Sequence, residues 1–530
     1  MSPSASGRGP SDRSRACPVV AARGPRWRAD GAPRERKRAN SWRRCYVATG
    51  AEESSSSVGI NETSQPVELL LAVRRGNRTL GSQIEDRLRR AIREGTLRPG
   101  SRLPSTRDLA RQLGISRRVV VDAYAQLAAE GYLSLRQGAR PRVSPTAASA
   151  LQAPVVPEVP ACRARFDFRP STPDVSTFPR AAWLRSLREA VSRVTDADLG
   201  YGDPRGVIAL RSALAEYLGR VRGVVADPER VVVTSGYTQG LGLVCRALAA
   251  AGARRIALED PSNPDDAIVA ARAGLEPVRV GVDAGGTRLD DVMRTDPDAL
   301  VLTPAHQQPT GVVLTGERRE ALLAWLRGRN AVAIEDDYDA EYRYDRAAIG
   351  ALQGLDPDHV AYAGSASKTL APALRLGWLV VPPSLLQAVT HEKLLADRGT
   401  ARIEQYAFAD FLNRGELDRH LRRMRARYRR RRDALVEALA DALPEARVCG
   451  AAAGLQVTVE LRDGDDERAI RAQARSRRVE IETMGDFRPA AAGSPPALVL
   501  GYAQMPEPTI RAGVRELAEA VHAARRDQTP

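Results

Sequence analysis

Residues 364–377 read GSASKTLAPALRLG, and this stretch decides how the rest of the chain is interpreted. It follows a short apolar run at 360–363 and places Lys368 in a loop of glycine, serine and threonine, with Arg375 seven residues further on. Only three of the 80 basic residues are lysines. Arginine neither deprotonates near neutral pH nor forms a Schiff base, so a retained lysine indicates that an amine is required. Accidental survival of this lysine is the alternative.

Similar apolar runs alternate with amphipathic helical patterns, such as 239–251, through the rest of the region from 166 to about 525. This alternation predicts an α/β sheet with helices between the strands. In such sheets ligands bind at the carboxyl ends of the strands, so the chemistry is expected just after each run. The sequence predicts buried parallel strands at 231–233, 255–258, 299–302, 332–334 and 378–381.

The run after 332–334 is strongly acidic. Residues 335–341 read EDDYDAE, five carboxylates in seven residues, and such crowding is costly unless a cation is near. A metal site is one interpretation, and a solvated acidic loop is another. A third is a single carboxylate that faces a protonated heterocycle, with a tyrosine beside it.

The run after 231–233 opens a helix with small residues, TSGYTQ at 234–239, whose backbone N–H groups suit a phosphate. An imine-forming lysine, hydroxyls and an arginine for a phosphate, and a remote aspartate for a pyridinium together describe a pyridoxal 5′-phosphate (PLP) site. A nucleotide loop is the rival, but the GxxxxGK[ST] pattern is absent from the sequence.

The excess positive charge lies at the front of the chain. Residues 1–146 carry 28 lysines and arginines against 13 acidic residues, which equals the +15 of the whole chain. A basic front on a neutral body suggests a polyanion partner for the front alone, although a GC-rich genome also favours arginine. Residues 1–65 lack apolar periodicity and are predicted to be a disordered basic tail.

Residues 105–130 show the pattern of a helix-turn-helix. Ser105 and Asp108 form a capping box, a short helix runs to Leu113, Gly114 supports a turn, and Ser116 is a suitable N-cap for a second helix. The second helix begins with two arginines, at the end that enters the major groove in such motifs. A short hairpin with a basic tip follows at 132–143, and would contact phosphates.

The composition bounds the remaining possibilities. A chain of 530 residues exceeds what one core supports, so two or more domains are expected. No apolar run approaches the length that spans a bilayer, and no membrane partner is expected. The five cysteines are scattered without a CxxC motif, which disfavours a disulfide framework and a zinc site and favours a reducing compartment.

The motifs resemble two known families in order along the chain. The stretch RLPSTRDLARQLGISRRVVVDAYAQLAAEGYL (102–133) resembles the winged helix-turn-helix of GntR-type regulators. The lysine loop resembles fold-type I PLP-dependent aminotransferases, together with YGDPRGVIALRSALAEYLGRVRGV (201–224), TPAHQQPTG (303–311), EDDYDAEYRY (335–344) and RHLRRMRARYRRRRDAL (419–435). The whole is similar to the MocR/GabR class of regulators. The resemblance implies a multidomain chain with a DNA-binding domain at 66–146, a linker at 147–165 and an aminotransferase-like α/β domain at 166–526.

The resemblance also implies roles for individual residues. Lys368 would form a Schiff base with PLP, Asp336 would pair with the pyridine nitrogen, and Tyr338 would hydrogen-bond the ring O3′. The phosphate would be held by Ser365, Arg375 and backbone N–H groups of Gly236, Tyr237 or Thr238, while His306 and Gln307 would line the ring and Tyr201 would reach the partner subunit's phosphate. The implied DNA contacts are Ser105, Arg107, Ser116, Arg117, Arg118, Gly138 and Arg140.

Four residues, at three places in the sequence, depart from the family pattern. Arg118 and Val119 stand where relatives have an Asn-Thr pair, so base readout should differ. Asn263 stands where relatives often have an aromatic residue that stacks on the cofactor ring. Val499 occupies the region where many aminotransferases place an arginine for the substrate carboxylate; Arg488 is a candidate replacement.

These observations predict a cytoplasmic, homodimeric regulator that binds paired sites in double-stranded DNA and senses PLP, or an amine or amino acid, through its second domain. A catalytically active PLP-dependent aminotransferase with an incidental DNA-binding module is the alternative. A third possibility is a DNA-binding protein whose second domain has lost the cofactor and serves only in dimerisation.

Overall fold

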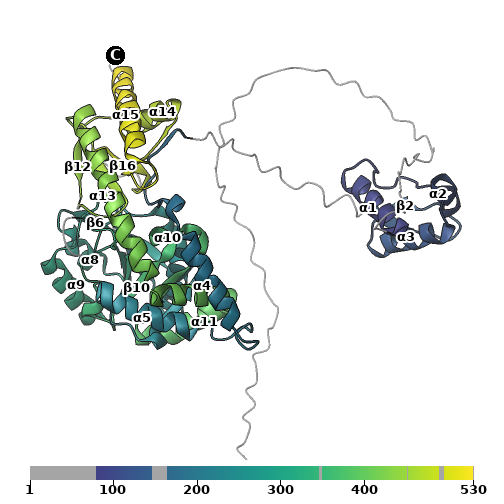
Figure 1. Ribbon diagram of the computed structural model, residues 1–530, viewed down its shortest axis with the longest axis horizontal. Helices are drawn as coiled ribbons and strands as arrows, with labels where there is room; N and C mark the ends of the chain where they lie inside the picture. Colours follow the sequence, from purple (N-terminus) through teal and green to yellow (C-terminus); the bar gives the residue numbers. More distant parts are fainter. Residues whose placement is uncertain (1–78, 146–163, 345–348, 451, 489–494, 529–530) are drawn as a thin grey trace, which may run out of the picture. The chain divides into compact units, whose positions relative to one another are not determined.

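The structure is a computed structural model that describes residues 79–145, 164–344, 349–450, 452–488 and 495–528. The described residues fall into two units, one before and one after the segment near residue 157 (Figure 1). The tail expected over 1–65 and nearly all of the linker expected over 147–165 lie outside the described residues.

The first unit is a three-helix domain with a two-stranded hairpin. Its core is built from one face of α1, where Ile84, Leu88 and Ile92 recur at helical spacing and are buried together with Leu109 and Leu127. The elements are α1 (Leu80–Arg93), α2 (Thr106–Leu113), α3 (Arg117–Ala129), β1 (Leu133–Ser134) and β2 (Arg142–Val143).

The local signals of the helix-turn-helix are confirmed with one difference. Ser105 Oγ accepts from the Asp108 backbone N–H at 3.1 Å and donates to its carboxylate at 2.6 Å, and Gly114 ends α2 in the left-handed region. Ser116 is at the N-cap of α3, but its side chain makes no capping hydrogen bond. Strands β1 and β2 pair antiparallel and form the expected wing.

The second unit contains an eight-stranded sheet in the order β4-β11-β10-β9-β8-β5-β6-β7. The expected strand at 378–381 exists as β11, but it runs antiparallel to both neighbours, so the prediction of a parallel strand is wrong there. Only a short segment connects β10 to β11, whereas a parallel neighbour needs a long crossover. The strands are β4 (Val231–Thr234), β5 (Arg255–Asp260), β6 (Glu276–Asp283), β7 (Gly286–Thr287), β8 (Ala299–Leu302), β9 (Val332–Asp337), β10 (Val360–Ser365) and β11 (Gly377–Val380).

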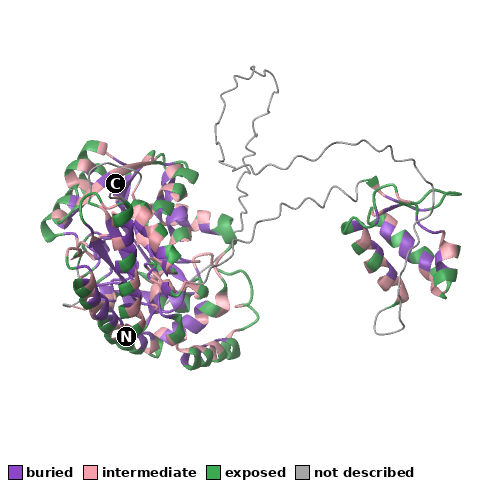
Figure 2. Cartoon of the chain, turned by 90° about the horizontal axis from the view of Figure 1, so that it is seen from above, coloured by how far each residue is buried: buried purple, intermediate pink, exposed green. Residues whose placement is uncertain are grey.

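Helices cover both faces of this sheet, and the buried residues concentrate along its strands (Figure 2). One face packs on α6, α7 and α11, and the other on α5, α9 and α12 together with part of α13. Within the described ranges, no helix combines the length and apolarity needed to cross a membrane. The helices are α4 (Arg180–Arg193), α5 (Ile208–Arg222), α6 (Tyr237–Ala250), α7 (Pro264–Arg272), α8 (Leu289–Thr295), α9 (Gly316–Arg329), α10 (Ala366–Thr369), α11 (Pro383–Asp397), α12 (Arg402–Asn413) and α13 (Glu416–Ala442).

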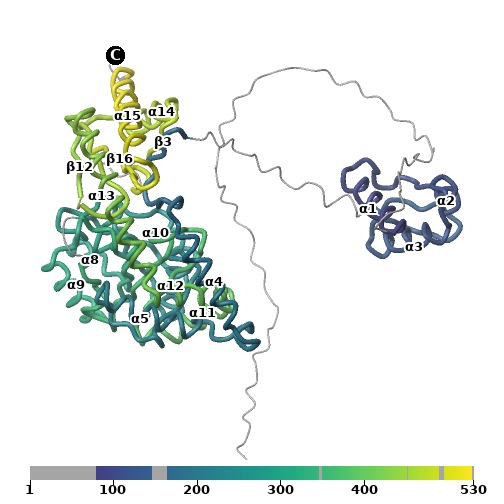
Figure 3. Tube along the Cα trace, in the orientation of Figure 1, coloured from purple at the N-terminus to yellow at the C-terminus, as the bar shows by residue number. Residues whose placement is uncertain are grey.

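A smaller antiparallel sheet in the order β12-β13-β16-β15 packs with two helices at the C-terminal end of the unit. Strand β3 (Phe166–Asp167), near the start of the unit, pairs in parallel with β14 (Val479–Glu480), so it lies beside this late part of the chain (Figure 3). The other elements are β12 (Arg447–Cys449), β13 (Gln456–Glu460), α14 (Glu467–Ser476), β15 (Glu482–Thr483), β16 (Ala497–Gly501) and α15 (Glu507–Gln528).

Candidate functional site

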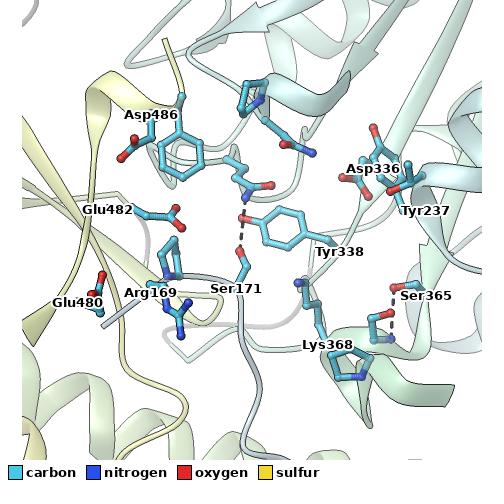
Figure 4. A pocket seen from close by; sticks show the side chains of 18 of the residues that line it. Arg169, Ser171, Tyr237, Asp336, Tyr338, Ser365, Lys368, Glu480, Glu482 and Asp486 are labelled. Carbon is cyan, nitrogen blue, oxygen red and sulfur yellow. Dashed lines mark hydrogen bonds between the residues drawn. The ribbon is translucent and has the colours of Figure 1, made fainter. Parts of the chain in front are cut away.

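A cavity of about 740 Å³ lies at the carboxyl ends of β4, β9 and β10 in the second unit. This is the edge where α/β sheets bind ligands, and the size is typical of a small-molecule site. Figure 4 shows that its side chains come from segments far apart in sequence. Seven of the predicted cofactor residues line it: Tyr237, Thr238, Asp336, Tyr338, Ser365, Lys368 and Arg375.

Lys368 is presented to the cavity by α10, which begins as soon as β10 ends at Ser365. Burial lowers the pKa of its amine, while the carboxylates of Asp336 and Asp339 raise it. Among the described residues, the amine has no hydrogen-bond or ion-pair partner. A lysine with a lowered pKa is more often uncharged, which is the form that attacks a carbonyl carbon.

Asp336 lies near the end of β9 and is buried, at 9% exposure. Burial, reinforced by Asp266 and Asp337, raises the pKa of its carboxyl well above the usual range. No hydrogen bond or ion pair to it is present in the described part of the chain. A cationic group beside it would therefore favour the ionised carboxylate.

Two neighbouring carboxylates of the acidic run have hydrogen-bond partners of their own. Glu335 accepts from the backbone N–H groups of Leu352 and Gln353, both at 2.9 Å. Asp339 pairs with His306 at 3.0 Å. No group of three or more potential metal ligands is found among the residues that the structure describes, so the metal interpretation gains no support there.

The opposite end of the cavity suits an anion. Helix α6 begins after Gly236 without a side-chain cap, so its first N–H groups are free to bind a ligand. The Arg375 guanidinium lies so close to Gly236 that a Cβ there would be 3.2 Å from it. Ser365 Oγ accepts from the Ser367 N–H at 3.3 Å, and Ser367 also lines the cavity. We did not predict Ser367, although the repeated serines of the SASK loop were a signal.

Two predicted ring contacts lie one layer behind the cavity. The Tyr338 hydroxyl is 3.1 Å from His306 Nδ1, so His306 supports Tyr338 from behind. Gln307 is buried and donates to the Pro261 carbonyl at 2.8 Å. Neither residue is among those that line the cavity, and their role as ring contacts stays a prediction.

Tyr201 lies outside the cavity of its own chain. Its side chain is 79% exposed, and the Arg398 guanidinium lies 5.9 Å from its ring centre. An exposed tyrosine is compatible with the predicted contact to a second subunit, which stays a prediction.

The departures noted in the sequence have clear structural counterparts. Asn263 lines the cavity, but its amide caps α7 and donates to Asp266 at 3.1 Å, so it offers no ring face. Arg488 lies 3.5 Å from Asp260, and it does not line the cavity. Val499 is fully buried.

The far wall of the cavity was not predicted. It combines the segment 169–171, α14 and the loop from β14 to residue 487. Nothing local in the sequence signals this wall, because it forms only when β3 pairs with β14 and β15 pairs with β16. Its charged members are Arg169, Arg471, Arg475, Glu480, Glu482 and Asp486.

The first unit presents the predicted DNA-contacting residues on its surface. Arg107, Arg117, Arg118, Gly138 and Arg140 are all exposed, and Ser105 and Ser116 mark the starts of α2 and α3. Arg118 lies 3.9 Å from Asp122 in a highly exposed pair, which contributes little stability and leaves the guanidinium available. Arginine at the N-terminal end of α3 suits a helix that enters the major groove.

Two family matches cover most of the described chain. Residues 80–143 match the gntR family of bacterial regulatory proteins, and residues 174–497 match aminotransferase class I and II. The fold and the site therefore define a class of protein: a helix-turn-helix regulator that carries an aminotransferase-like domain.

Relatives of the whole chain share this architecture. The chain is 31% identical over 447 residues to the HTH-type pyridoxine biosynthesis transcriptional regulator PdxR of Corynebacterium glutamicum, covering 84% of this chain and 96% of that protein. It is 33% identical over 471 residues to the probable rhizopine catabolism regulatory protein MocR of Rhizobium meliloti, covering 83% and 93%. The chain thus belongs to the MocR-type family of HTH transcriptional regulators.

Solved structures confirm the fold of the second unit. LysN, the α-aminoadipate aminotransferase of Thermus thermophilus, is 28% identical with a TM-score of 0.61, covering 68% of this chain and 93% of LysN. The multiple substrate aminotransferase of Thermococcus profundus is 24% identical with a TM-score of 0.63, covering 70% and 94%. The similarity to the regulators named above favours transcriptional regulation over the alternative, an aminotransferase with an incidental DNA-binding module.

Proposed function

We propose that the second unit binds PLP and that occupation of its cavity controls DNA binding by the first unit. One observation carries the proposal: the side chains of Lys368, Asp336 and Arg375 line one cavity, and none of these side chains has a hydrogen bond or ion pair to a described residue. An amine, a carboxylate and a guanidinium match the aldehyde, the protonated ring nitrogen and the phosphate of PLP.

Different residues of the chain would bind different parts of the cofactor. Arg375 and the N–H groups at the start of α6 would bind the phosphate, and Ser365 would add a hydroxyl. Asp336 would keep the ring nitrogen protonated, and Tyr338, backed by His306, would orient the ring edge. Lys368 would hold the aldehyde covalently and would be released when an amine ligand takes its place. Bound PLP supplies an electrophilic carbon and an electron-accepting ring.

The remaining expectations are part of the same proposal. The domain boundaries are those expected from the sequence, and the regulator acts in the cytoplasm as a homodimer. Its two DNA-binding units would then read paired half-sites. The effector is an amine or amino acid that competes with Lys368 for the cofactor, and this competition shifts the population of DNA-binding states.

Two measurements on the full chain test the proposal. Borohydride reduction in the presence of PLP should fix the cofactor to the peptide that contains Lys368, and Lys368→Arg should abolish this because a guanidinium forms no Schiff base. Fluorescence anisotropy with DNA from upstream of the protein's own gene should show sequence-specific binding that changes with PLP. Trapping that persists in Lys368→Arg, or an absence of specific DNA binding, contradicts the proposal.

A further inference from the structure

Every arginine in the far wall of the cavity has a carboxylate partner in the chain. Three arginines line it, Arg169, Arg471 and Arg475, and each is already paired within the chain. Arg169 donates to Asp167 at 2.6 and 2.9 Å, Arg471 donates to Asp486, and Arg475 lies 3.5 Å from Glu480. Each of these guanidinium groups therefore already has a carboxylate partner in the chain, so a ligand carboxylate would have to share it, although the Arg471 Nε has no hydrogen-bond acceptor among the described residues.

Glu482 is the exception among the acidic residues of this wall. It is half-buried on β15 and has no hydrogen bond or ion pair to any described residue. Figure 4 shows its carboxylate directed into the cavity that also contains the Lys368 amine. A partly desolvated carboxylate without a partner is costly, and a positively charged ligand group would remove that cost.

The pairing of β15 with β16 places the Glu482 carboxylate opposite an uncharged residue. Glu482 is the cross-strand partner of Val499, and directly opposite residues of an antiparallel pair share a face of the sheet. Val499 is fully buried with Met484 and Phe487 and does not line the cavity, so no charged side chain stands opposite Glu482 on β16. Among the charged side chains of the far wall, Glu482 is the one without a partner of opposite charge in the described part of the chain.

The charged groups around Glu482 leave its negative charge uncompensated. Burial raises the pKa of the Glu482 carboxyl, and Arg471 and Arg169 oppose this rise while Asp167 adds to it. Arg169 is paired with Asp167 and Arg471 with Asp486, so Glu482 has no arginine partner of its own within the described ranges. A ligand carboxylate here would meet this unmatched negative charge and guanidinium groups that are already paired.

We propose, resting on the PLP site proposed above, that the effector is a primary amine with a second positively charged nitrogen, and that Glu482 receives this second nitrogen. One amine would compete with Lys368 for the cofactor, and the distal cation would form a charge-assisted hydrogen bond with Glu482. Glu482 is thus a specificity-determining residue that selects diamines over monoamines and amino acids.

The test is a titration of the full-length, PLP-loaded protein with three probes of equal chain length: 1,4-diaminobutane, butylamine and 4-aminobutanoate. The absorbance of the bound cofactor reports binding. The diamine should bind at least tenfold more tightly than the other two, a factor that corresponds to about 1.4 kcal/mol.

The variant Glu482→Gln should remove the advantage of the diamine and leave the affinity for butylamine unchanged. Glu460→Gln is the matched control: Glu460 lies on β13 of the same sheet, away from the cavity and paired with Arg447, and its loss should keep the diamine preference. A preference that survives Glu482→Gln, or tighter binding of 4-aminobutanoate, overturns the inference.

These outcomes are distinct from a failure of the proposed function. If the wild-type chain forms no chromophore with PLP, the cofactor proposal fails, and calorimetry with the same three probes still reads the selectivity of the wall. If the chromophore forms at Lys368 but the diamine gains nothing, only the inference about Glu482 fails.

Discussion

Arg222 donates to Asp337 at 2.6 Å, and both side chains are 1% exposed. The pair lies next to Asp336 on β9, and Tyr362 adds a hydroxyl to the same Asp337 oxygen at 2.7 Å. Arg222 thus compensates the charge of the carboxylate that follows Asp336 along the strand. Glu335, Asp337 and Asp339 each have a partner of their own, which makes the crowding of the acidic run less costly.

The first prediction follows from this pair. Arg222→Met should leave the Asp337 charge buried and unpaired, and should lower the free energy of unfolding by about 3–5 kcal/mol. Urea unfolding followed by circular dichroism measures the loss. The double variant Arg222→Met/Asp337→Asn should recover part of it, and a double variant as unstable as the single one would show that the charge is not the cause.

The second prediction concerns the anion end of the cavity. Gly236→Ala would place a Cβ 3.2 Å from the Arg375 guanidinium and would strain a backbone at φ +116°, so PLP affinity should fall at least tenfold. Gly252→Ala is the control, because its φ is also positive, +97°, but no atom lies within 4 Å of the added Cβ. Absorbance titration with PLP should separate them, and equal affinities would remove Gly236 from the phosphate site.

The third prediction concerns pH. Burial, with Arg423 nearby, lowers the pKa of His420 to about 4 from its usual 6.5. The unfolded chain therefore takes up this proton at a higher pH than the folded one. The contribution is complete above pH 6.5 and is lost as the pH falls to 4, by roughly 3 kcal/mol from this one group.

Unfolding free energies measured at pH 7 and pH 4.5 check this third prediction. His420→Leu should lose less stability than the wild type over that interval. The exposed His391 on α11 supplies the control His391→Gln, which should follow the wild type. If His420→Leu loses as much stability as the wild type, His420 is not the titrating group.

The fourth prediction concerns the wing. If Arg140 contacts a DNA phosphate, Arg140→Ala should weaken binding to all sequences alike and reduce the slope of log affinity against log salt by about 1. Anisotropy titrations across a salt series measure the slope. Arg515→Ala, exposed on α15, should leave it unchanged. A loss of sequence preference at constant slope would indicate a base contact for Arg140 instead.

Local signals in the sequence were sufficient to predict the elements that position the predicted cofactor residues. The run at 332–334 predicted the first part of β9 with Asp336 just after it, although the strand extends to Asp337, and the apolar run at 360–363 predicted β10 before Lys368. Caps and glycine turns likewise located α2 and α3. In each case the residues that decide the structure are neighbours in sequence.

Long-range pairing explains what could not be predicted. A continuous apolar run such as 378–381 indicates a buried strand, but not its direction, because both directions bury the same side chains. The far wall is a stronger example. Glu482 reaches the cavity only because β15 pairs with β16, and Arg169 only because β3 pairs with β14. Neither pairing produces a hydrophobic periodicity in the sequence of the segments that pair.

The pairing of β3 with β14 brings the start of the second unit to the cavity. Arg169, Pro170 and Ser171 form part of the cavity wall, and Ser171 is seven peptide bonds from residue 164, where the described chain resumes after the segment that leads from the DNA-binding unit. A ligand that contacts Ser171 would therefore touch the segment by which the chain enters the second unit. The ligand and the covalent connection to the first unit are thus separated by one short stretch of chain, which the β3–β14 pairing holds in place.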